Sequence, residues 1–342
     1  MVVRSRAPLR LGFGGGGSEL PPYIEKYGGL VLNATINKFA YASIEETSDH
    51  TELLSLDQGC SATIGSLIEP KTHLPKHLRL HYGVLKRVAN EFNGGSINHI
   101  KLSTYCDVPI GSGLGTSSTI TVAIVKAFDE YLRLSLSEYQ IADLAHKIER
   151  EDLGLSGGLQ DQYASTFGGI NYIEFKKNGA VVVNPLRLSE KTVAELEYST
   201  ILWFTGAARD SGSVIQKNLQ LLYENNSSYI EKTHQIKGVV PDLKESILKG
   251  QLDKFASLIN SGWMAKRKMH SSVSNDRVDQ IYEKIITMGA MAAKITGAGN
   301  GGYMMIICRP ECRNELINFL AKINDSFLNF TFTETGAFSW RV

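Results

Sequence analysis

The chain has 342 residues, more than one compact core usually supports, so two domains are expected. Its 36 Lys and Arg residues balance 35 Asp and Glu residues, and the net charge of +1 argues against a nucleic-acid or anionic-membrane role for the whole surface. The four cysteines are scattered, no signal-peptide pattern opens the chain, and no apolar run is long enough to cross a bilayer. We therefore expect a cytoplasmic protein with reduced thiols.

The first half of the chain alternates strand and helix patterns. Residues 2–10 and 34–44 show the alternation that predicts strands, and residues 97–105 predict another. Apolar residues at helical spacing predict helices over residues 78–92 and 117–132. The first of these helices is expected to stop at its Asn-Gly-Gly end.

A capping-box pattern marks the start of the next helix. Ser137 and Gln140 have the required spacing, and the helix is predicted over residues 138–151, with Glu149 near its end. Two alternating segments, residues 170–175 and 180–183, then predict a hairpin.

The second half predicts a mixed order of strands and helices, which favours an α+β layer architecture. The expected elements are a strand at 200–204, several helices within 213–289, strands at 292–296 and 303–308, a helix at 311–323 and strands within 327–340. No Pro- or Ser-rich linker marks a boundary. We expect the first domain to span residues 1–186 and the second residues 187–342.

A glycine and serine loop at residues 109–119 lies between a predicted strand and a predicted helix, a context typical of phosphate binding. Its glycines let the backbone approach a ligand, N–H groups at the helix start point outward, and hydroxyl groups can reach phosphate oxygens or a metal. A nucleoside triphosphate is the expected ligand. The candidate binding residues are Pro109, Gly111, Ser112, Gly113, Leu114, Gly115, Thr116, Ser117 and Ser118.

Two further glycine clusters lie near the ends of the chain, at residues 12–17 and 297–302. A single glycine-rich loop is as readily a plain turn as a ligand loop. Three such clusters in one chain indicate loops that converge on one ligand.

Residues 7–10, 109–118 and 294–302 resemble the three motifs of the GHMP small-molecule kinases, a superfamily that includes galactokinase, homoserine kinase and mevalonate kinase. The resemblance covers the chain nearly end to end, with the motifs in the expected order. It implies a two-domain α+β fold, with an N-terminal domain like the second domain of ribosomal protein S5, a ferredoxin-like C-terminal domain and an active site in the cleft between them. It also implies ATP and Mg²⁺ as cofactors.

Within this superfamily, residues 14–23 and the pair Gly28-Gly29 are most similar to bacterial D-glycero-D-manno-heptose 7-phosphate kinases. Those enzymes phosphorylate a sugar at its anomeric hydroxyl. The resemblance therefore implies a small-molecule sugar phosphate as substrate, converted to a 1,7-bisphosphate for GDP-heptose synthesis. It implies neither a nucleic-acid nor a membrane partner, and it leaves a homo-oligomer open.

The resemblance also carries over to catalytic and metal-binding residues. Asp161 matches the family's Asp beside the acceptor hydroxyl and is the expected general base, and Arg10 matches the basic residue beside that Asp. Ser117 and Glu149 match the family's metal ligands. The alternatives are a turn carboxylate for Asp161 and a solvated carboxylate within a charge run for Glu149.

The expected substrate contacts are Gly16, Gly17, Ser18, Glu19, Gly158, Arg209 and Gly299. Ser18 and Glu19 stand where sugar-kinase relatives carry a Thr-Asp pair, so the hydroxyl pattern that this Glu holds can differ. Arg209 follows a predicted buried strand and could bind a substrate phosphate bidentately. The basic cluster at residues 266–270 is an alternative cationic site, or a solvated face. The adenine pocket is expected between the central loop and residues 55–80.

Three other functions stay open at this point. One is a galactokinase-like or fucokinase-like enzyme that acts on an unphosphorylated sugar. Another is a sugar and ATP sensor without turnover on the same fold. The third, a Rossmann-type oxidoreductase that uses residues 12–17, is disfavoured because no early strand and helix unit with a following ribose-binding acid is apparent.

Overall fold

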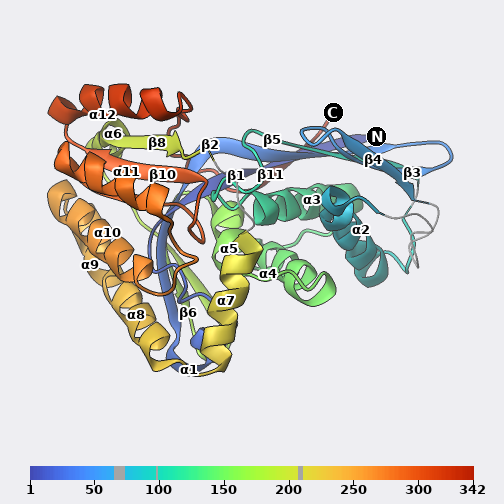
Figure 1. Ribbon diagram of the computed structural model, residues 1–342. Coiled ribbons are helices and arrows are strands. Elements are labelled where there is room, and N and C mark those ends of the chain that lie inside the picture. The colour runs from blue at the N-terminus through green and yellow to red at the C-terminus, as the bar shows by residue number, and fades with distance from the viewer. Residues whose placement is uncertain (65–73, 98, 207–210) are drawn as a thin grey trace.

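The computed structural model describes residues 1–64, 74–97, 99–206 and 211–342, which form two β-sheets flanked by helices (Figure 1). The strands are β1 (Val2–Gly14), β2 (Gly29–Glu46), β3 (Thr51–Ser55), β4 (Cys60–Ile64), β5 (Ile100–Cys106), β6 (Ile170–Phe175), β7 (Val181–Pro185), β8 (Thr200–Phe204), β9 (Ala290–Ile295), β10 (Tyr303–Cys308) and β11 (Phe338–Arg341). The α-helices are α1 (Pro21–Tyr27), α2 (Arg79–Phe92), α3 (Thr116–Leu132), α4 (Glu138–Lys147), α5 (Gln160–Phe167), α6 (Glu190–Ser199), α7 (Ser211–Tyr223), α8 (Ser227–Gly238), α9 (Val240–Leu248), α10 (Leu252–Arg267), α11 (Asp276–Thr287) and α12 (Pro310–Ile323).

Strand β2 is the centre of the larger, eight-stranded sheet. One edge of β2 pairs antiparallel with β1, while its other edge pairs first with β6 and then with β5. The sheet order is β11-β1-β2-β5-β3-β4, and β7 extends it beyond β6. The pairing of β1 with β2 shifts register between Gly12 and Gly14. The last residues of β1 therefore leave the regular sheet and run into the first glycine cluster.

Helix α3 is buried on nearly all sides and packs across β1 and β2. Its apolar residues Val122, Ala123, Ile124, Ala127 and Phe128 are fully buried, because the sheet lies on one side and α2, α4 and α5 lie on the others. Figure 1 shows α2, α3 and α4 on the same face of the larger sheet. This packing fixes the start of α3 at the level of Arg10 on β1, whose backbone N–H donates to the carbonyl of Leu114.

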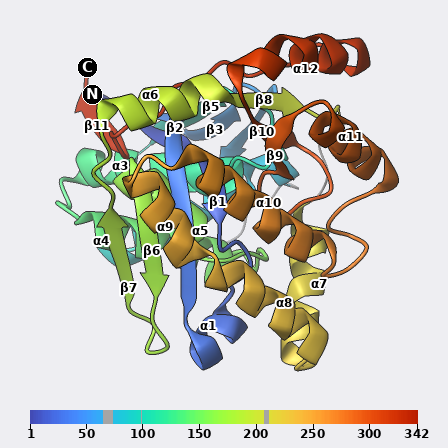
Figure 2. The ribbon, with the colours of Figure 1, turned by 90° about the vertical axis from the view of Figure 1, so that its left-hand side faces the viewer.

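The smaller sheet has the order β8-β10-β9, with both pairings antiparallel. Its core contains Trp203 of β8 and Trp263 of α10, together with residues of α11 and α12. Figure 2 shows α8, α9 and α10 running beside β1 and β2, which they contact. Those helices thereby bring the second half of the chain against the end of β1. Among the described helices, none combines the length and apolar character needed to cross a membrane.

The end of the chain returns to the larger sheet, where β11 pairs antiparallel with β1. Of the strands predicted within residues 327–340, the structure forms β11, and residues 327–337 form no further strand. The segment before β11 crosses from one sheet to the other, so it makes only isolated bridges, between Phe327 and Trp203 and between Phe332 and Ile36. The domain boundary near residue 186 falls between β7 and α6 and stays a prediction.

The helix predicted over residues 138–151 changes type near its end. Its capping box is confirmed, because Ser137 and Gln140 each accept a hydrogen bond from the other's backbone N–H. The α-helical part ends at Lys147, and a π-helical turn covers Ile148–Asp152. π-turns occur often at functional sites because they redirect side chains. Here Glu149 is 1% exposed rather than solvated at a helix end.

Candidate active site

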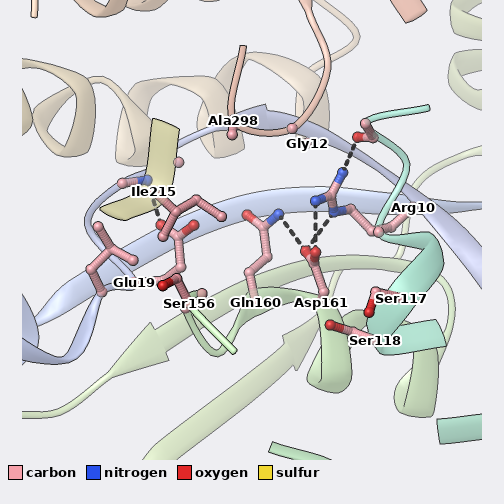
Figure 3. Close-up of a pocket in the computed structure, with 18 of the residues that line it drawn as sticks. Arg10, Gly12, Glu19, Ser117, Ser118, Ser156, Gln160, Asp161, Ile215 and Ala298 are labelled. Atoms are coloured by element: carbon pink, nitrogen blue, oxygen red, sulfur yellow. Dashed lines mark hydrogen bonds and ion pairs between the residues drawn. The ribbon is translucent and has the colours of Figure 1, made fainter. Parts of the chain in front are cut away.

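A cavity of about 570 Å³ lies between the end of β1, the starts of α3 and α5, and the loop after β9. Residues of all three glycine clusters line it, which confirms that these clusters converge. Figure 3 shows Arg10, Glu19, Gln160 and Asp161 side by side in this cavity, with Ser117 and Ser118 next to Asp161. The wall extends to Ser55, His77 and Leu80, where the adenine pocket was expected.

The start of α3 presents an anion-binding surface to the cavity. Its N-cap is Gly115, in the left-handed conformation, and no side chain caps the helix. The first N–H groups of a helix have no intrahelical partner and carry partial positive charge. Among the predicted nucleotide-binding residues, those lining the cavity are Gly111, Gly113, Gly115, Thr116, Ser117 and Ser118. Ser112 and Leu114 are fully buried, and Pro109 accepts the N–H of Ser112.

The loop at residues 297–302 packs backbone to backbone on the glycine and serine loop at residues 109–119, here called the phosphate loop. A Cβ at Gly113 would lie 2.6 Å from the carbonyl oxygen of Thr296, and one at Gly297 would lie 2.8 Å from the carbonyl oxygen of Gly113. A Cβ at Gly302 would overlap the carbonyl oxygen of Ser112. Any larger residue at these positions would push the two loops apart. Asn300 adopts φ 65°, a left-handed conformation that Asn tolerates better than most residues.

Arg10 and Asp161 form a bidentate ion pair at the floor of the cavity. Arg10 Nε donates to Asp161 Oδ1 at 2.7 Å and Arg10 Nη2 to Oδ2 at 2.9 Å (Figure 3). Arg10 Nη1 donates to the carbonyl oxygen of Gly113 at 2.7 Å, so the guanidinium also holds the phosphate loop. The Arg10 side chain is 6% exposed, whereas that of Asp161 is 26% exposed. The carboxylate is therefore held from behind and remains open to a ligand in front.

Glu149 lies under the start of α3 within a small polar cluster. Its Oε1 accepts from Ser117 Oγ at 3.3 Å, and its Oε2 accepts from Ser118 Oγ at 2.8 Å and from Gln162 Nε2. All three residues line the cavity, where Ser117 is exposed and Glu149 and Ser118 are buried. A carboxylate and a hydroxyl are hard oxygen donors of the kind that Mg²⁺ prefers.

Glu19 lies in the same cavity, on the side of Asp161 that faces away from α3 (Figure 3). Its Oε2 accepts the N–H of Gly17 at 2.5 Å, and a Cβ at Gly158 would lie 2.5 Å from Glu19 Cγ. Burial raises the pKa of this carboxyl, although its own N–H, that of Gly17 and the nearby Lys266 ammonium oppose the shift. The side chain thus packs against the Gly158 loop, with its carboxyl group held by the N–H of Gly17.

The remaining predicted substrate residues fall in different places. Gly16 and Gly17 line the cavity. Ser18 is fully buried, and its hydroxyl donates to the carbonyls of Gly15 and Leu30, which fixes the turn before α1. Gly299 packs on Val273, where a Cβ would overlap the Val273 carbonyl oxygen. Arg209 lies outside the described residues.

The structure adds cavity residues that the sequence reasoning did not select. Gln160 Nε2 donates to Asp161 Oδ1 at 3.4 Å, and Arg150 donates to the carbonyls of Leu155 and Gly158. Lys294 donates to the carbonyls of Gly12 and Phe13. Lys294 belongs to a segment that carries the family resemblance, and Gln160 adjoins Asp161, which the resemblance identifies, so the sequence holds a signal for both. Arg150 lay in a charge run and carried none.

Loss of water contact changes the pKa of two lysines in this wall. Burial lowers the pKa of Lys266 to about 8, with Arg10 contributing and Glu19 opposing. Burial lowers the pKa of Lys294 to about 7, and the Lys266 and Arg10 charges add to the effect. Both ammonium groups are therefore costly to keep charged in the protein alone, and an anionic ligand would stabilise them.

Comparison with known proteins assigns the chain to a family. The family profile "GHMP kinases N terminal domain" matches residues 79–169, and "GHMP kinases C terminal" matches residues 243–325. The chain is 38% identical to "D-glycero-alpha-D-manno-heptose 7-phosphate kinase" of Campylobacter jejuni, over 100% of this chain and 99% of the relative. The chain belongs to the GHMP kinase family. It is therefore a small-molecule kinase that uses ATP.

Solved structures agree with this family assignment. A crystal structure described as a D-glycero-D-manno-heptose 1-phosphate kinase from Bacteroides thetaiotaomicron superposes with a TM-score of 0.83 at 40% identity, over 99% of both chains. The galactokinase of Lactococcus lactis, solved with galactose, has a TM-score of 0.76 at 17% identity and covers 98% of this GHMP kinase and 95% of its own chain. The expected two-domain GHMP kinase fold is thus confirmed, and the Rossmann-type alternative is excluded.

The contact between the two glycine loops predicts the effect of Gly113→Ala. This change places a Cβ 2.6 Å from a backbone oxygen at a residue with φ +81°, so we expect both strain and separation of the loops. ATP affinity measured by calorimetry should fall by at least about tenfold. Gly94→Ala is the matched control, because Gly94 has φ +62° but nothing within 4 Å of the new Cβ. The control should lose about 1–2 kcal/mol of unfolding free energy and retain ATP affinity; equal ATP affinity in both variants would contradict the prediction.

Proposed function

We propose that this GHMP kinase transfers the γ-phosphoryl group of ATP to the anomeric C1 hydroxyl of D-glycero-α-D-manno-heptose 7-phosphate, giving the 1,7-bisphosphate for GDP-heptose synthesis in the cytoplasm. The observation that carries a kinase reaction is the Arg10–Asp161 pair beside the uncapped start of α3. The choice of a heptose phosphate is supported by the names of the two relatives at 38% and 40% identity. The two names place the phosphate on different carbons of the heptose, carbon 7 in the first and carbon 1 in the second.

In this proposal, Asp161 is the group that receives the hydroxyl proton. The C1 oxygen attacks the γ-phosphorus, its proton passes to the Asp161 carboxylate, and ADP leaves with the bridging oxygen. Because Arg10 binds both carboxylate oxygens, the carboxylate is fixed in orientation. An intact pair of this kind favours a catalytic protein over a sensor without turnover.

The described residues also fit a bound Mg²⁺, with Ser117 and Glu149 as its protein ligands. No group of three or more His, Cys, Asp or Glu side chains suited to a metal ion occurs among the described residues. Mg²⁺ usually keeps several waters and binds substrate phosphates, so two protein ligands are sufficient. The ion would neutralise charge on the β- and γ-phosphate oxygens.

Coupled ADP release tests the proposed reaction. The purified chain with Mg-ATP is presented with heptose 7-phosphate, mannose 6-phosphate, galactose, fucose and mevalonate, and phosphorus NMR locates the new phosphate. We expect turnover of heptose 7-phosphate at C1. Turnover of only galactose or fucose would replace this proposal with an unphosphorylated substrate, and ATP binding without any turnover would favour a sensor.

Asp161→Asn should lower kcat by about 10²- to 10⁴-fold, because the amide preserves the shape of the side chain but cannot take the proton. ATP affinity should change little, since α3 and the phosphate loop remain. Asp152→Asn is the matched control: Asp152 also pairs bidentately with an arginine, Arg87, at 2.7 Å for both contacts, but outside the cavity. Near-normal kcat in Asp161→Asn would eliminate the general-base role.

Glu149→Gln should raise the Mg²⁺ concentration needed for half-maximal activity, because the neutral amide is a weaker metal ligand than a carboxylate. Activity is measured across a magnesium titration at saturating ATP. Glu151→Gln is the control, since Glu151 lies on the same π-turn with its side chain 62% exposed. Identical titration curves for the two variants would remove Glu149 from the metal site.

A further inference from the structure

Lys266, near the end of α10, places its ammonium group in the wall of the cavity. The residue is 9% exposed, and Nζ donates to the carbonyl oxygen of Gly297 at 2.7 Å. An ammonium has three N–H donors, and this is its one partner among the described residues. A buried cation with unused donors is costly unless a ligand supplies acceptors and negative charge.

The structure separates Lys266 from the other basic residues of the 266–270 cluster. Arg267 pairs with Asp279 at 3.0 Å and with Glu283 at 3.2 Å. Lys268 is exposed, and His270 Nε2 bonds the side chain of Asn218 at 2.6 Å. Within that cluster, Lys266 alone lines the cavity among the described residues.

The surroundings of Lys266 offer further donors. Tyr229 of α8 and Trp263 of α10 line the same cavity and are each 1% exposed. The Tyr229 hydroxyl and Trp263 Nε1 have no hydrogen-bond partner in the described part of the chain. The nearby acceptor, Glu19, already accepts the N–H of Gly17. A ligand rich in acceptors therefore matches this part of the wall better than one rich in donors.

Space for such a ligand exists because residue 16 is glycine. A Cβ built at Gly16 would lie 3.8 Å from Lys266 Nζ, with no other atom within 4 Å. Any larger side chain there would occupy the space in front of the ammonium. The cavity wall also holds Arg10, which pairs with Asp161 and donates to the carbonyl oxygen of Gly113, next to the uncapped start of α3.

We propose that Lys266 binds the non-transferred phosphate of the sugar substrate in the space left by Gly16, and so selects a phosphorylated sugar over the same sugar without phosphate. This inference rests on the proposed sugar-kinase function and adds the residue that recognises the second phosphate. The ATP phosphates bind at α3, and the sugar extends from Asp161 past Glu19 to Lys266.

The test compares Lys266→Gln with the wild type on D-glycero-D-manno-heptose 7-phosphate and on the unphosphorylated heptose. Gln removes the charge and keeps a donor for the Gly297 carbonyl. The ratio of kcat/KM for the phosphorylated over the unphosphorylated sugar should fall by about 10- to 100-fold, mainly through KM for the sugar phosphate. Lys268→Gln, the exposed neighbour, should leave the ratio at the wild-type value.

Two results would overturn the inference. An unchanged ratio would show that Lys266 does not contact the second phosphate. Equal losses on both sugars, together with weaker ATP binding, would assign Lys266 to the ATP phosphates instead. If the wild type turns over neither sugar, the proposed function fails, but this inference is still open to test. Calorimetry then compares the affinity for mannose 6-phosphate with that for mannose, in the wild type and in Lys266→Gln. A preference for the phosphorylated sugar that is lost in Lys266→Gln supports the role of Lys266, and an unchanged preference overturns it.

A second variant guards against misfolding of Lys266→Gln. Gly16→Val adds bulk in front of the ammonium at a backbone position without positive φ, and it leaves the charge in place. We expect it to reduce the same ratio by about tenfold or more, because the phosphate no longer reaches Lys266. An unchanged ratio in this variant would contradict the location proposed for the phosphate.

Discussion

The rest of the site depends on the ion pair and hydrogen bonds that the buried guanidinium of Arg10 makes. Its three nitrogen atoms donate to Asp161 and to the carbonyl of Gly113, while its backbone N–H donates to Leu114. A desolvated cation must have its donors satisfied, so β1, the phosphate loop and α5 are held at fixed distances from one another. The same contacts hold the Asp161 carboxylate in one orientation. One residue thus links the phosphate loop to the proposed general base.

Close approach of backbone segments explains why the chain needs three glycine clusters. The phosphate loop and the loop after β9 touch through their carbonyl groups, and Tyr303 N–H donates to the carbonyl of Ser112 at 2.9 Å. Gly158 likewise leaves room for the Glu19 side chain, and Gly16 leaves space in front of the Lys266 ammonium group. In each case the missing Cβ lets a polar group from a distant segment reach the cavity. Packing of α3 against the larger sheet holds these loops in place.

The two halves of the chain contribute different charges to the cavity. The first half supplies the start of α3, Arg10, Asp161 and Glu149, and the helices of the second half supply Lys266 and the donors of Tyr229 and Trp263. An acceptor sugar between them would meet a carboxylate on one side and an ammonium on the other. This arrangement suits a substrate with a hydroxyl at one end and a phosphate at the other.

Local pattern determined much of this protein. Glycine spacing predicted the three loops, the capping box predicted the start of α4, and local strand patterns predicted β8 and β10 with the bounds that the structure shows. Tertiary structure alone decided the π-turn that buries Glu149, the return of β11 to the larger sheet, and the selection of Lys266 from its basic cluster. Helix and strand signals arise between residues a few positions apart, whereas Arg10 meets Asp161 across 151 positions and Lys266 meets Gly297 across 31. Burial of a charge depends on such distant contacts, and no local spacing encodes it.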